Sequence, residues 1–353
     1  MIGKFYAALL AFAVSVSALA GEAAKDFDRL GRAAAEKETE TAVTTVTTVP
    51  TETEKPKETT TTTVPEKTKK TKETTATTVP VETKKPKETT ATTVPAETEA
   101  PVTQPVRGIV RVDGETVIVD GKEYKLSFED NFDGHTLDGS KWEKCPEWKR
   151  QDLNNYWDND MSYLDGEGNL IIEMSYDENE EKYLSGGVRS KGKFEQAYGY
   201  FEIRCTVNTV PGYWTAFWLM GETVNNTTMG GRNGTEIDIM ETPFFDKKQV
   251  QNTLNWDGYG EEHKALGQIS DIDVYDGEYH TFSLLWTESE YVFFIDGEES
   301  WRTDAKEAEG TCEVPLYMKI TSETGSWTRN PPLPESLPDY MKVDHVRVYA
   351  EKK

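Results

Sequence analysis

Short runs in which apolar and polar residues alternate fill the C-terminal part of the chain. Phe201, Ile203 and Cys205, for example, stand at every second position, the period at which side chains of a β-strand share one face. This alternation, together with runs rich in β-branched and aromatic residues, predicts twelve strands. They cover residues 109–112, 116–119, 124–128, 170–174, 200–207, 214–220, 236–241, 250–256, 280–286, 291–295, 316–320 and 341–349. We find no long stretch with the period of an amphipathic helix.

Turn sequences separate the predicted strands. Asp-Gly pairs stand at 113–114, 120–121, 165–166, 276–277 and 296–297. Such pairs favour tight hairpin turns because both residues accept a left-handed backbone. Many short strands without intervening helices predict an all-β fold, an antiparallel β-sandwich of the jelly-roll type. We expect residues 106–353 to form this one domain, since all-β sandwiches reach such a size without splitting.

The first 105 residues differ from this domain. Residues 1–20 hold Lys4, an apolar run and a small-residue end, a pattern typical of a signal peptide that predicts a secreted, extracellular protein. Residues 21–105 are rich in Thr, Pro, Lys and Glu, and the pair Val-Pro recurs every fifteen residues from Val49 to Val94. Such a segment cannot bury enough apolar surface to fold, so we expect a disordered linker. We expect no membrane span, because no segment stays apolar over the length that a bilayer requires.

Charge and cysteine content narrow the range of functions. The formal net charge is −24, and residues 1–105 hold nearly equal numbers of basic and acidic residues, so the negative charge belongs to the folded domain. A domain of that sign repels nucleic acid, anionic lipid and heavily sulfated glycans. We therefore expect no nucleic-acid partner, and among glycans a neutral polysaccharide is the easier partner. We also expect a monomer. The three cysteines, Cys145, Cys205 and Cys312, allow at most one disulfide within the chain and match no metal-binding motif.

One predicted strand carries three acids. The segment 234–243 reads Gly-Thr-Glu-Ile-Asp-Ile-Met-Glu-Thr-Pro. Acidic residues are uncommon in strands and like charges on one face repel one another, so a purely structural role explains this segment poorly. Glu236 and Asp238 share a face, while the isoleucines beside them point into the core. Strict alternation would bury Glu241 as well, but a bulge at 239–240 returns it to the face of the other acids.

Three acids on one face of a sheet suggest a chemistry. Two carboxyls about 5 Å apart suit a double-displacement glycosidase, in which one attacks the anomeric carbon and the other first donates and then removes a proton. Their repulsion raises the pKa of one carboxyl, which keeps it protonated near neutral pH. The middle Asp238 can hydrogen-bond the nucleophile and hold its orientation. The sequence therefore predicts a cleft on the concave face of the sheet.

The sequence Glu-Ile-Asp-Ile-Met-Glu at 236–241 resembles the bulged catalytic signature of glycoside hydrolase family 16, in its laminarinase and agarase branch. The likeness extends over 128–349 and includes the segments 187–194, 198–204, 214–218 and 343–349. It implies a concanavalin A-like jelly roll in which Glu236 is the nucleophile, Asp238 its helper and Glu241 the acid/base.

Aromatic residues near the acids are candidates for substrate binding, because sugar rings stack their C–H faces on aromatic side chains. Trp214 and Trp218 are four positions apart and share a strand face, although burial in the core is the alternative for both. Trp256 and Trp327, in positions beside loops, are further candidates. Arg189 is another, because it lies in a segment that carries the resemblance.

Two positions depart from the family pattern. Many relatives have a His before the Trp in the strand that follows the acids, whereas this chain has Asn255, and His263 nearby is either its substitute or a solvated loop residue. Asn131 stands where relatives often have a Glu that helps bind a structural calcium. Asp344 and backbone oxygens could still form a weaker site. We expect no required cofactor and no catalytic metal, and structural calcium stays open.

The leading hypothesis is a secreted, retaining endo-β-1,3- or β-1,3-1,4-glucanase. An endo-hydrolase of β-galactan or agarose is its nearest rival, because the bulged signature occurs in both groups. A third reading is a lectin-like module that binds glycans without cleaving them, since one sandwich fold serves many functions. A module of that kind has no reason to hold three repelling acids together, and this favours an enzyme.

Overall fold

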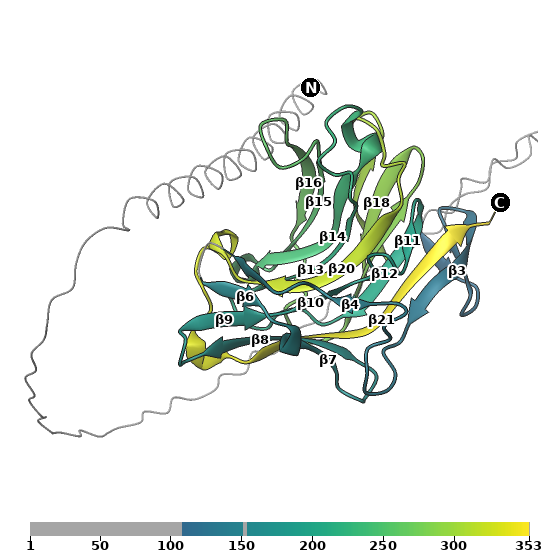
Figure 1. The fold of residues 1–353 in the computed structure, drawn as a ribbon. Helices are drawn as coiled ribbons and strands as arrows, with labels where there is room; N and C mark the ends of the chain where they lie inside the picture. The colour runs from purple at the N-terminus through teal and green to yellow at the C-terminus, as the bar shows by residue number, and fades with distance from the viewer. Residues whose placement is uncertain (1–107, 151–153, 353) are drawn as a thin grey trace, which may run out of the picture. The chain divides into compact units, whose positions relative to one another are not determined.

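The computed structural model describes residues 108–150 and 154–352 (Figure 1). The predicted signal peptide, 1–20, and linker, 21–105, lie outside the described residues. In the described part of the chain, no helix has the length and apolar character to cross a membrane. The helical segments found there are short 3-10 turns: η1 (Asn159–Met161), η2 (Gly230–Asn233), η3 (Phe245–Lys247), η4 (Ser326–Thr328) and η5 (Pro334–Ser336).

Two sheets make up the domain. The smaller runs in the order β16 (Lys264–Ser270), β15 (Gln249–Trp256), β14 (Thr235–Phe244), β13 (Trp214–Met220), β20 (Leu316–Glu323), β10 (Gly187–Arg189) and β4 (Glu143–Lys144), with β11 (Glu195–Gln196) also paired to β20. Figure 1 shows β14, β13 and β20 side by side in the middle of this sheet. Their central position buries their backbones, and β14 is the strand that carries the three acids.

The larger sheet runs in the order β19 (Glu298–Asp304), β18 (Glu290–Ile295), β17 (His280–Trp286), β12 (Gly199–Cys205), β21 (Asp339–Glu351), β8 (Leu170–Asp177), β9 (Lys182–Ser185), β6 (Asn155–Trp157) and β5 (Trp148–Arg150). Four further strands join it beside β21 and β8: β1 (Ile109–Arg111), β2 (Thr116–Val119), β3 (Lys122–Asp130) and β7 (Ser162–Leu164). Among the pairings described, β6 with β9 is parallel and the others are antiparallel.

The main hydrophobic core lies between the two sheets. It joins Phe217 and Ile237 of the smaller sheet to Phe201, Phe282 and Val346 of the larger one, all fully buried. Such alternate burial along each strand is what the period-two sequence pattern predicts. The all-β sandwich is therefore confirmed, and each of the twelve predicted strands is present with ends shifted by a few residues.

A second hydrophobic cluster lies on the other face of the larger sheet. The N-terminal hairpin β2–β3, which turns at Asp120 and Gly121 with positive φ angles of 48° and 81°, places Val117 and Val119 against this face. Their partners in the cluster include Tyr200, Leu285 and Phe294. The predicted Asp-Gly hairpin is thus present, and it covers apolar surface that the sandwich core leaves outside.

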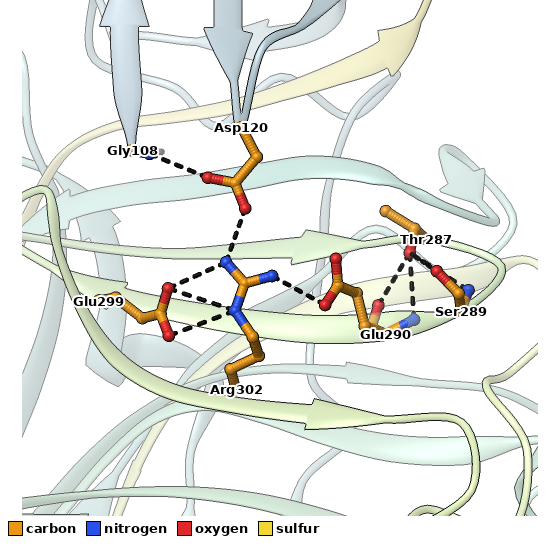
Figure 2. A network of polar contacts seen from close by, with 7 residues as sticks. All are labelled: Gly108, Asp120, Thr287, Ser289, Glu290, Glu299 and Arg302. Carbon is orange, nitrogen blue, oxygen red and sulfur yellow. Dashed lines mark hydrogen bonds and ion pairs between the residues drawn. The ribbon is translucent and has the colours of Figure 1, made fainter. Parts of the chain in front are cut away.

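Arg302 of β19 connects this hairpin to the rest of the sheet (Figure 2). Its guanidinium lies 2.6 Å from Oδ2 of Asp120, 2.7 Å from Glu290 and 2.9 Å from Glu299. The other oxygen of Asp120 accepts the backbone N–H of Gly108 at 2.9 Å. One partly buried cation therefore neutralises carboxylates from three segments and holds the first described residue of the domain in place.

The three cysteines are free and buried. Cys205 lies in β12 within the main core, as its alternating strand predicts. Burial raises the pKa of Cys145 and Cys312 to about 11, so both thiols stay protonated and unreactive at neutral pH. The disulfide that the cysteine count allowed does not form within the described residues.

The residues considered for structural calcium already contact arginine and histidine side chains. Oδ1 of Asn131 accepts a hydrogen bond from Arg347 at 3.2 Å, and the carboxylate of Asp344 lies 3.1 Å from Arg204 and 2.7 Å from His345. Among the described residues, no group of three or more His, Cys, Asp or Glu is placed to hold a metal ion. These side chains therefore offer a cation no cluster of oxygen ligands.

Candidate active site

Strand β14 contains a β-bulge between its second and third acids. Two neighbouring residues of β13 face Met240 and Asp238, so Ile239 has no pairing partner on that strand. The register against β15 shifts over the same residues. The extra residue turns Glu241 to the face that carries Glu236 and Asp238, and the bulge expected at 239–240 is present.

The three acids meet in one cavity of about 180 Å³. Asp238 and Glu241 are buried, with exposed fractions of 5% and 8%, whereas Glu236 is partly exposed. The cavity brings carboxyl groups together with aromatic rings and one guanidinium. Its lining residues are Arg150, Trp214, Ala216, Trp218, Glu236, Asp238, Glu241, Thr321, Glu323 and Trp327. Convergent polar groups among aromatic walls are typical of a small-molecule or sugar site.

Glu236 accepts two hydrogen bonds. The phenol of Tyr259 donates to its Oε2 at 2.5 Å, and the side-chain amide of Asn255 donates to its Oε1 at 3.3 Å. Burial raises the pKa of Glu236, and the hydrogen bond from Tyr259, the charge of Lys319 and the amide of Asn255 oppose that rise. Of the three acids, Glu236 is therefore the one whose ionised form the surroundings favour most.

Asn255 and His263 form a hydrogen-bonded pair behind the acids. The amide nitrogen of Asn255 also donates to Oδ2 of Asp238 at 2.9 Å, so its oxygen is left facing Nε2 of His263 at 3.1 Å. An amide oxygen only accepts, which means that Nε2 of His263 carries the hydrogen. Burial lowers the pKa of His263. His263 is thus a half-buried partner of the site rather than a solvated loop residue, and it hydrogen-bonds Asn255, the residue that stands where the family pattern has a His.

The other two acids hold their protons more tightly. Burial, followed by the charges of Glu241 and Glu236, raises the pKa of Asp238 well above its ordinary value. Burial also raises the pKa of Glu241, with further contributions from the charges of Glu236 and Glu323 and an opposing one from Arg150. The pKa values of Glu236 and Glu241 are thus both raised, and the rise is larger for Glu241, so on acidification Glu241 takes up its proton before Glu236 does.

One wall of the cavity is aromatic and carries an ion pair. The ring of Trp214 meets the ring of Trp327 edge to face, with centroids 5.6 Å apart. The guanidinium of Arg150 lies 4.9 Å from the centroid of Trp214 and forms an ion pair with Glu323. Trp214 and Trp327 therefore line the cavity as predicted, and Arg150 places a positive charge beside them.

The opposite wall is built on Trp218. Its indole N–H donates to Oγ1 of Thr321 at 3.0 Å, and the ammonium of Lys319 lies 3.7 Å from the centre of its ring. Burial lowers the pKa of Lys319. The contact with an aromatic face partly replaces the water that this ammonium loses. Trp218 therefore lines the cavity and is not a core residue.

Two predicted binding residues do not reach the cavity. Trp256 is 4% exposed and packs in the main core, because it follows Asn255 on β15 and so points to the opposite face of the sheet. Arg189 is held by Glu143 of the neighbouring strand, with Nε donating to Oε1 at 2.7 Å. Both corrections follow from strand pairing: Trp256 faces away from the acids, and the guanidinium of Arg189 already has a carboxylate partner.

Several residues of the site were not predicted. Lys319, Thr321 and Glu323 stand at alternate positions of β20, which begins with the apolar run Leu316–Met318 and also holds Ser322. Their period-two spacing was a signal that could have found them. Tyr259 and Arg150 gave no such signal, since each reaches the cavity only through the packing of distant segments.

The chain was compared with known proteins once this geometry was established. Residues 123–351 match the family model described as "Beta-porphyranase A-D, GH16 domain". In overall structure, the domain is similar to the endo-beta-1,3-glucanase from Pyrococcus furiosus, with a TM-score of 0.56 and 22% identity, over 68% of this chain and 100% of that chain. The shared fold agrees with the jelly roll predicted from the sequence.

Two curated relatives are named for the cleavage of different glycosidic bonds. The chain is 24% identical over 260 residues to "Glucan endo-1,3-beta-glucosidase A1" of Niallia circulans, which is 64% of this chain and 38% of that protein. It is 26% identical over 242 residues to "Keratan-sulfate endo-1,4-beta-galactosidase" of Sphingobacterium multivorum, which is 64% of this chain and 55% of that protein. The chain thus spans less than two thirds of the length of both relatives.

Proposed function

Because the chain belongs to glycoside hydrolase family 16, as its match over residues 123–351 shows, we propose that it is a retaining endo-hydrolase of a β-linked polysaccharide. The observation that carries this proposal is the bulge of β14, which brings Glu236 and Glu241 into one cavity with Asp238 between them. Without that bulge, Glu241 would be a carboxyl buried in a hydrophobic core.

In this proposal the two glutamates divide the chemistry. Glu236, ionised and oriented by Tyr259 and Asn255, attacks the anomeric carbon and forms a glycosyl ester. Glu241, whose pKa is raised by burial and by neighbouring carboxylates, protonates the departing oxygen and then takes a proton from the water that cleaves the ester. Asp238 shares the amide of Asn255 with Glu236 and fixes the relative position of the two groups.

We propose that the substrate is a β-1,3- or mixed β-1,3-1,4-glucan. The net charge of −24 disfavours heavily sulfated chains, and one relative is named for endo-1,3-β-glucosidase activity. Trp214, Trp218 and Trp327 supply flat apolar faces for uncharged sugar rings. A galactan is the second candidate, because the matching family model is named for porphyranases and another relative for endo-galactosidase activity.

Hydrolysis of a panel of polysaccharides tests this proposal. The purified protein is incubated with laminarin, lichenan, agarose, β-galactan and porphyran, and the products are sized and followed by NMR. We expect fragments of intermediate length from a glucan, released first as the β-anomer. Glu236→Gln should abolish hydrolysis and leave polysaccharide binding intact, because an amide cannot attack the anomeric carbon. Initial release of the α-anomer would rule out double displacement, and binding without cleavage by the unaltered protein would indicate a lectin-like module.

We also propose that the protein is exported and that its catalytic domain acts outside the cell at the end of a long linker. The support is the composition of residues 1–20 and 21–105. Expression in a secreting host, followed by N-terminal sequencing of the protein from the medium, tests the first part. Retention of the whole chain in the cell would contradict it.

A further inference from the structure

A second cavity, of about 310 Å³, lies at the hairpin formed by β5 and β6. We call it the outer cavity. It is lined by Glu147, Trp148, Lys149, Tyr156, Trp157, Asp158 and Lys182. Three aromatic residues and four charged ones thus surround a space that contains none of the proposed catalytic acids.

The aromatic side chains of the outer cavity are arranged as an open platform. The ring of Trp148 is 46% exposed and meets the buried ring of Trp157 edge to face, with centroids 5.3 Å apart. Covering the exposed apolar face of such a ring with a ligand is favourable, because it removes apolar surface from water. The exposed face of Trp148 is therefore free to stack on a flat apolar surface.

Polar groups around the platform leave hydrogen-bond donors for a ligand. The ammonium groups of Lys149 and Lys182 lie 5.3 and 5.2 Å from the ring of Tyr156. The acids of the rim have local partners, since Asp158 accepts the backbone N–H of Asp160 at 2.8 Å and Glu147 accepts the side-chain amide of Asn159 at 3.4 Å. The ammonium of Lys182 lies 2.9 Å from Glu180, and an ammonium has three hydrogens to donate, so this ion pair does not use all of them. Ammonium groups beside aromatic faces suit the hydroxyl oxygens and C–H faces of a pyranose ring.

Arg150 connects the outer cavity to the candidate active site. Its guanidinium lies 6.0 Å from the ring of Trp148 and 4.9 Å from the ring of Trp214. It lies between a ring of the outer cavity and a ring of the active-site cavity, and it belongs to the same strand as Trp148. Arg150 thus contacts one ring from each cavity.

Lys319 is a second cation that contacts one ring from each cavity. Its ammonium lies 4.9 Å from the ring of Trp157 and 3.7 Å from the ring of Trp218. Trp157 in turn donates its indole N–H to the backbone oxygen of Ser322 at 3.1 Å, which fixes β6 against the strand that carries Lys319. Two cations therefore each lie against one ring from the outer cavity and one ring from the active-site cavity, which places the two cavities close together.

We propose that the outer cavity is a remote sugar-binding subsite, which holds a pyranose residue of the same polysaccharide chain away from the bond that is cut. This inference rests on the proposed function. An endo-acting enzyme gains from such a subsite because binding energy from distant parts of the substrate helps to position the bond that reacts. Trp148 stacks on the sugar, and Lys149 and Lys182 donate to its hydroxyl oxygens.

Chain-length dependence tests the subsite. Trp148→Ala is compared with Trp148→Phe, which keeps a ring, and with Tyr163→Ala, which removes an aromatic residue that is 38% exposed and lines neither cavity. Each variant is assayed on the polysaccharide that the protein hydrolyses and on its oligosaccharides of increasing length. We expect kcat/KM of Trp148→Ala to fall by roughly tenfold on the polysaccharide, mainly through KM, with a loss that shrinks as the substrate shortens. Trp148→Phe should recover most of it.

Three results separate this inference from the proposed function. An equal loss at every chain length, or kinetics of Trp148→Ala that match those of Tyr163→Ala, would overturn the subsite and leave the hydrolase intact. If the unaltered protein cleaves nothing in the panel, the proposed function fails. In that case the subsite is tested by binding alone. The mobility of Glu236→Gln in gels that contain each polysaccharide is compared with the mobility of the double variant that also carries Trp148→Ala. Retardation that Trp148→Ala weakens supports the subsite, and any other result overturns it.

Discussion

The phenol of Tyr259 donates a hydrogen bond of 2.5 Å to Oε2 of Glu236. Tyr259 comes from the loop after β15, whereas Glu236 lies near the start of β14. The bond joins a loop residue to the proposed nucleophile and counteracts the rise in pKa that burial causes. Tyr259 therefore acts on the ionisation of Glu236 without carrying a charge itself.

Replacing Tyr259 should move the acid limb of the pH profile. Tyr259→Phe removes a donor to the ionised carboxylate, so the pKa of Glu236 rises. Activity requires ionised Glu236 and is lost as the pH falls through that pKa, so the acid limb of kcat/KM should move to higher pH. If the lost hydrogen bond stabilised the carboxylate by ~1.4 kcal/mol, the pKa of Glu236, and with it the acid limb, should shift by about one pH unit.

The control for this change is Tyr163→Phe. The phenol of Tyr163 donates to Oε2 of Glu173 at 3.0 Å, a similar pair that lies outside the cavity, and its loss should leave the profile unchanged. An acid limb that stays in place in Tyr259→Phe would contradict the role given to this residue.

His263 should affect turnover more than substrate binding. His263→Ala leaves the amide oxygen of Asn255 without its donor, so the amide no longer has one preferred orientation toward the acids. We expect kcat to fall by about tenfold, the equivalent of ~1.4 kcal/mol for one hydrogen bond, with KM nearly unchanged. His263→Gln keeps a donor and should recover part of the loss. Equal kcat values for the two variants would mean that His263 only fills space.

The charge of Glu323 should raise the pH at which activity is lost on the alkaline side of the profile. Its charge raises the pKa of Glu241, and Arg150 opposes that effect. Glu241 acts in its protonated form, so activity is lost as the pH rises through its pKa. Glu323→Gln removes a negative charge, lowers this pKa and should move the alkaline limb of kcat/KM to lower pH. Glu143→Gln, which breaks a carboxylate–guanidinium pair outside the cavity, is the matched control, and a limb that moves equally in both would refute the assignment.

Glu241 can be identified as the acid/base by chemical rescue. Glu241→Ala should lose most activity on polysaccharide, yet keep the first step on aryl glycosides whose leaving group needs little protonation. Added azide should restore the second step, because a small anionic nucleophile needs no general base, and a β-glycosyl azide should appear among the products. Loss of the same size on both substrates, without any effect of azide, would count against Glu241 in this role.

The sequence predicted the strands that show alternation or a run of β-branched and aromatic residues, twelve in all, and the three acids of β14 predicted its bulge. The unpredicted strands lack such a signal. β5, β6 and β9 have three or four residues, and β16 and β19 are longer but lie at the ends of the two sheet orders and are largely polar or exposed. The same alternation applied to β15 would have turned Trp256 away from the acids once Asn255 was placed beside them.

The unpredicted residues of the site depend on contacts between distant segments. Arg150 and Glu323 are 173 positions apart and meet because β6, which pairs with β5, is hydrogen-bonded to β20 through Trp157 and Ser322. Asn255 and His263 are only eight positions apart, but their contact requires the loop between β15 and β16 to fold back over the sheet. Neither contact is indicated by a local sequence pattern.

The N-terminal hairpin affects where a fragment of this domain should begin. A fragment cut where the family match begins, at residue 123, would lose β1 and β2. It would uncover the outer apolar face formed by Tyr200, Leu285 and Phe294, and Arg302 would lose the carboxylate of Asp120. We therefore expect a fragment that begins at Gly108 to be more stable and more soluble than one that begins at residue 123.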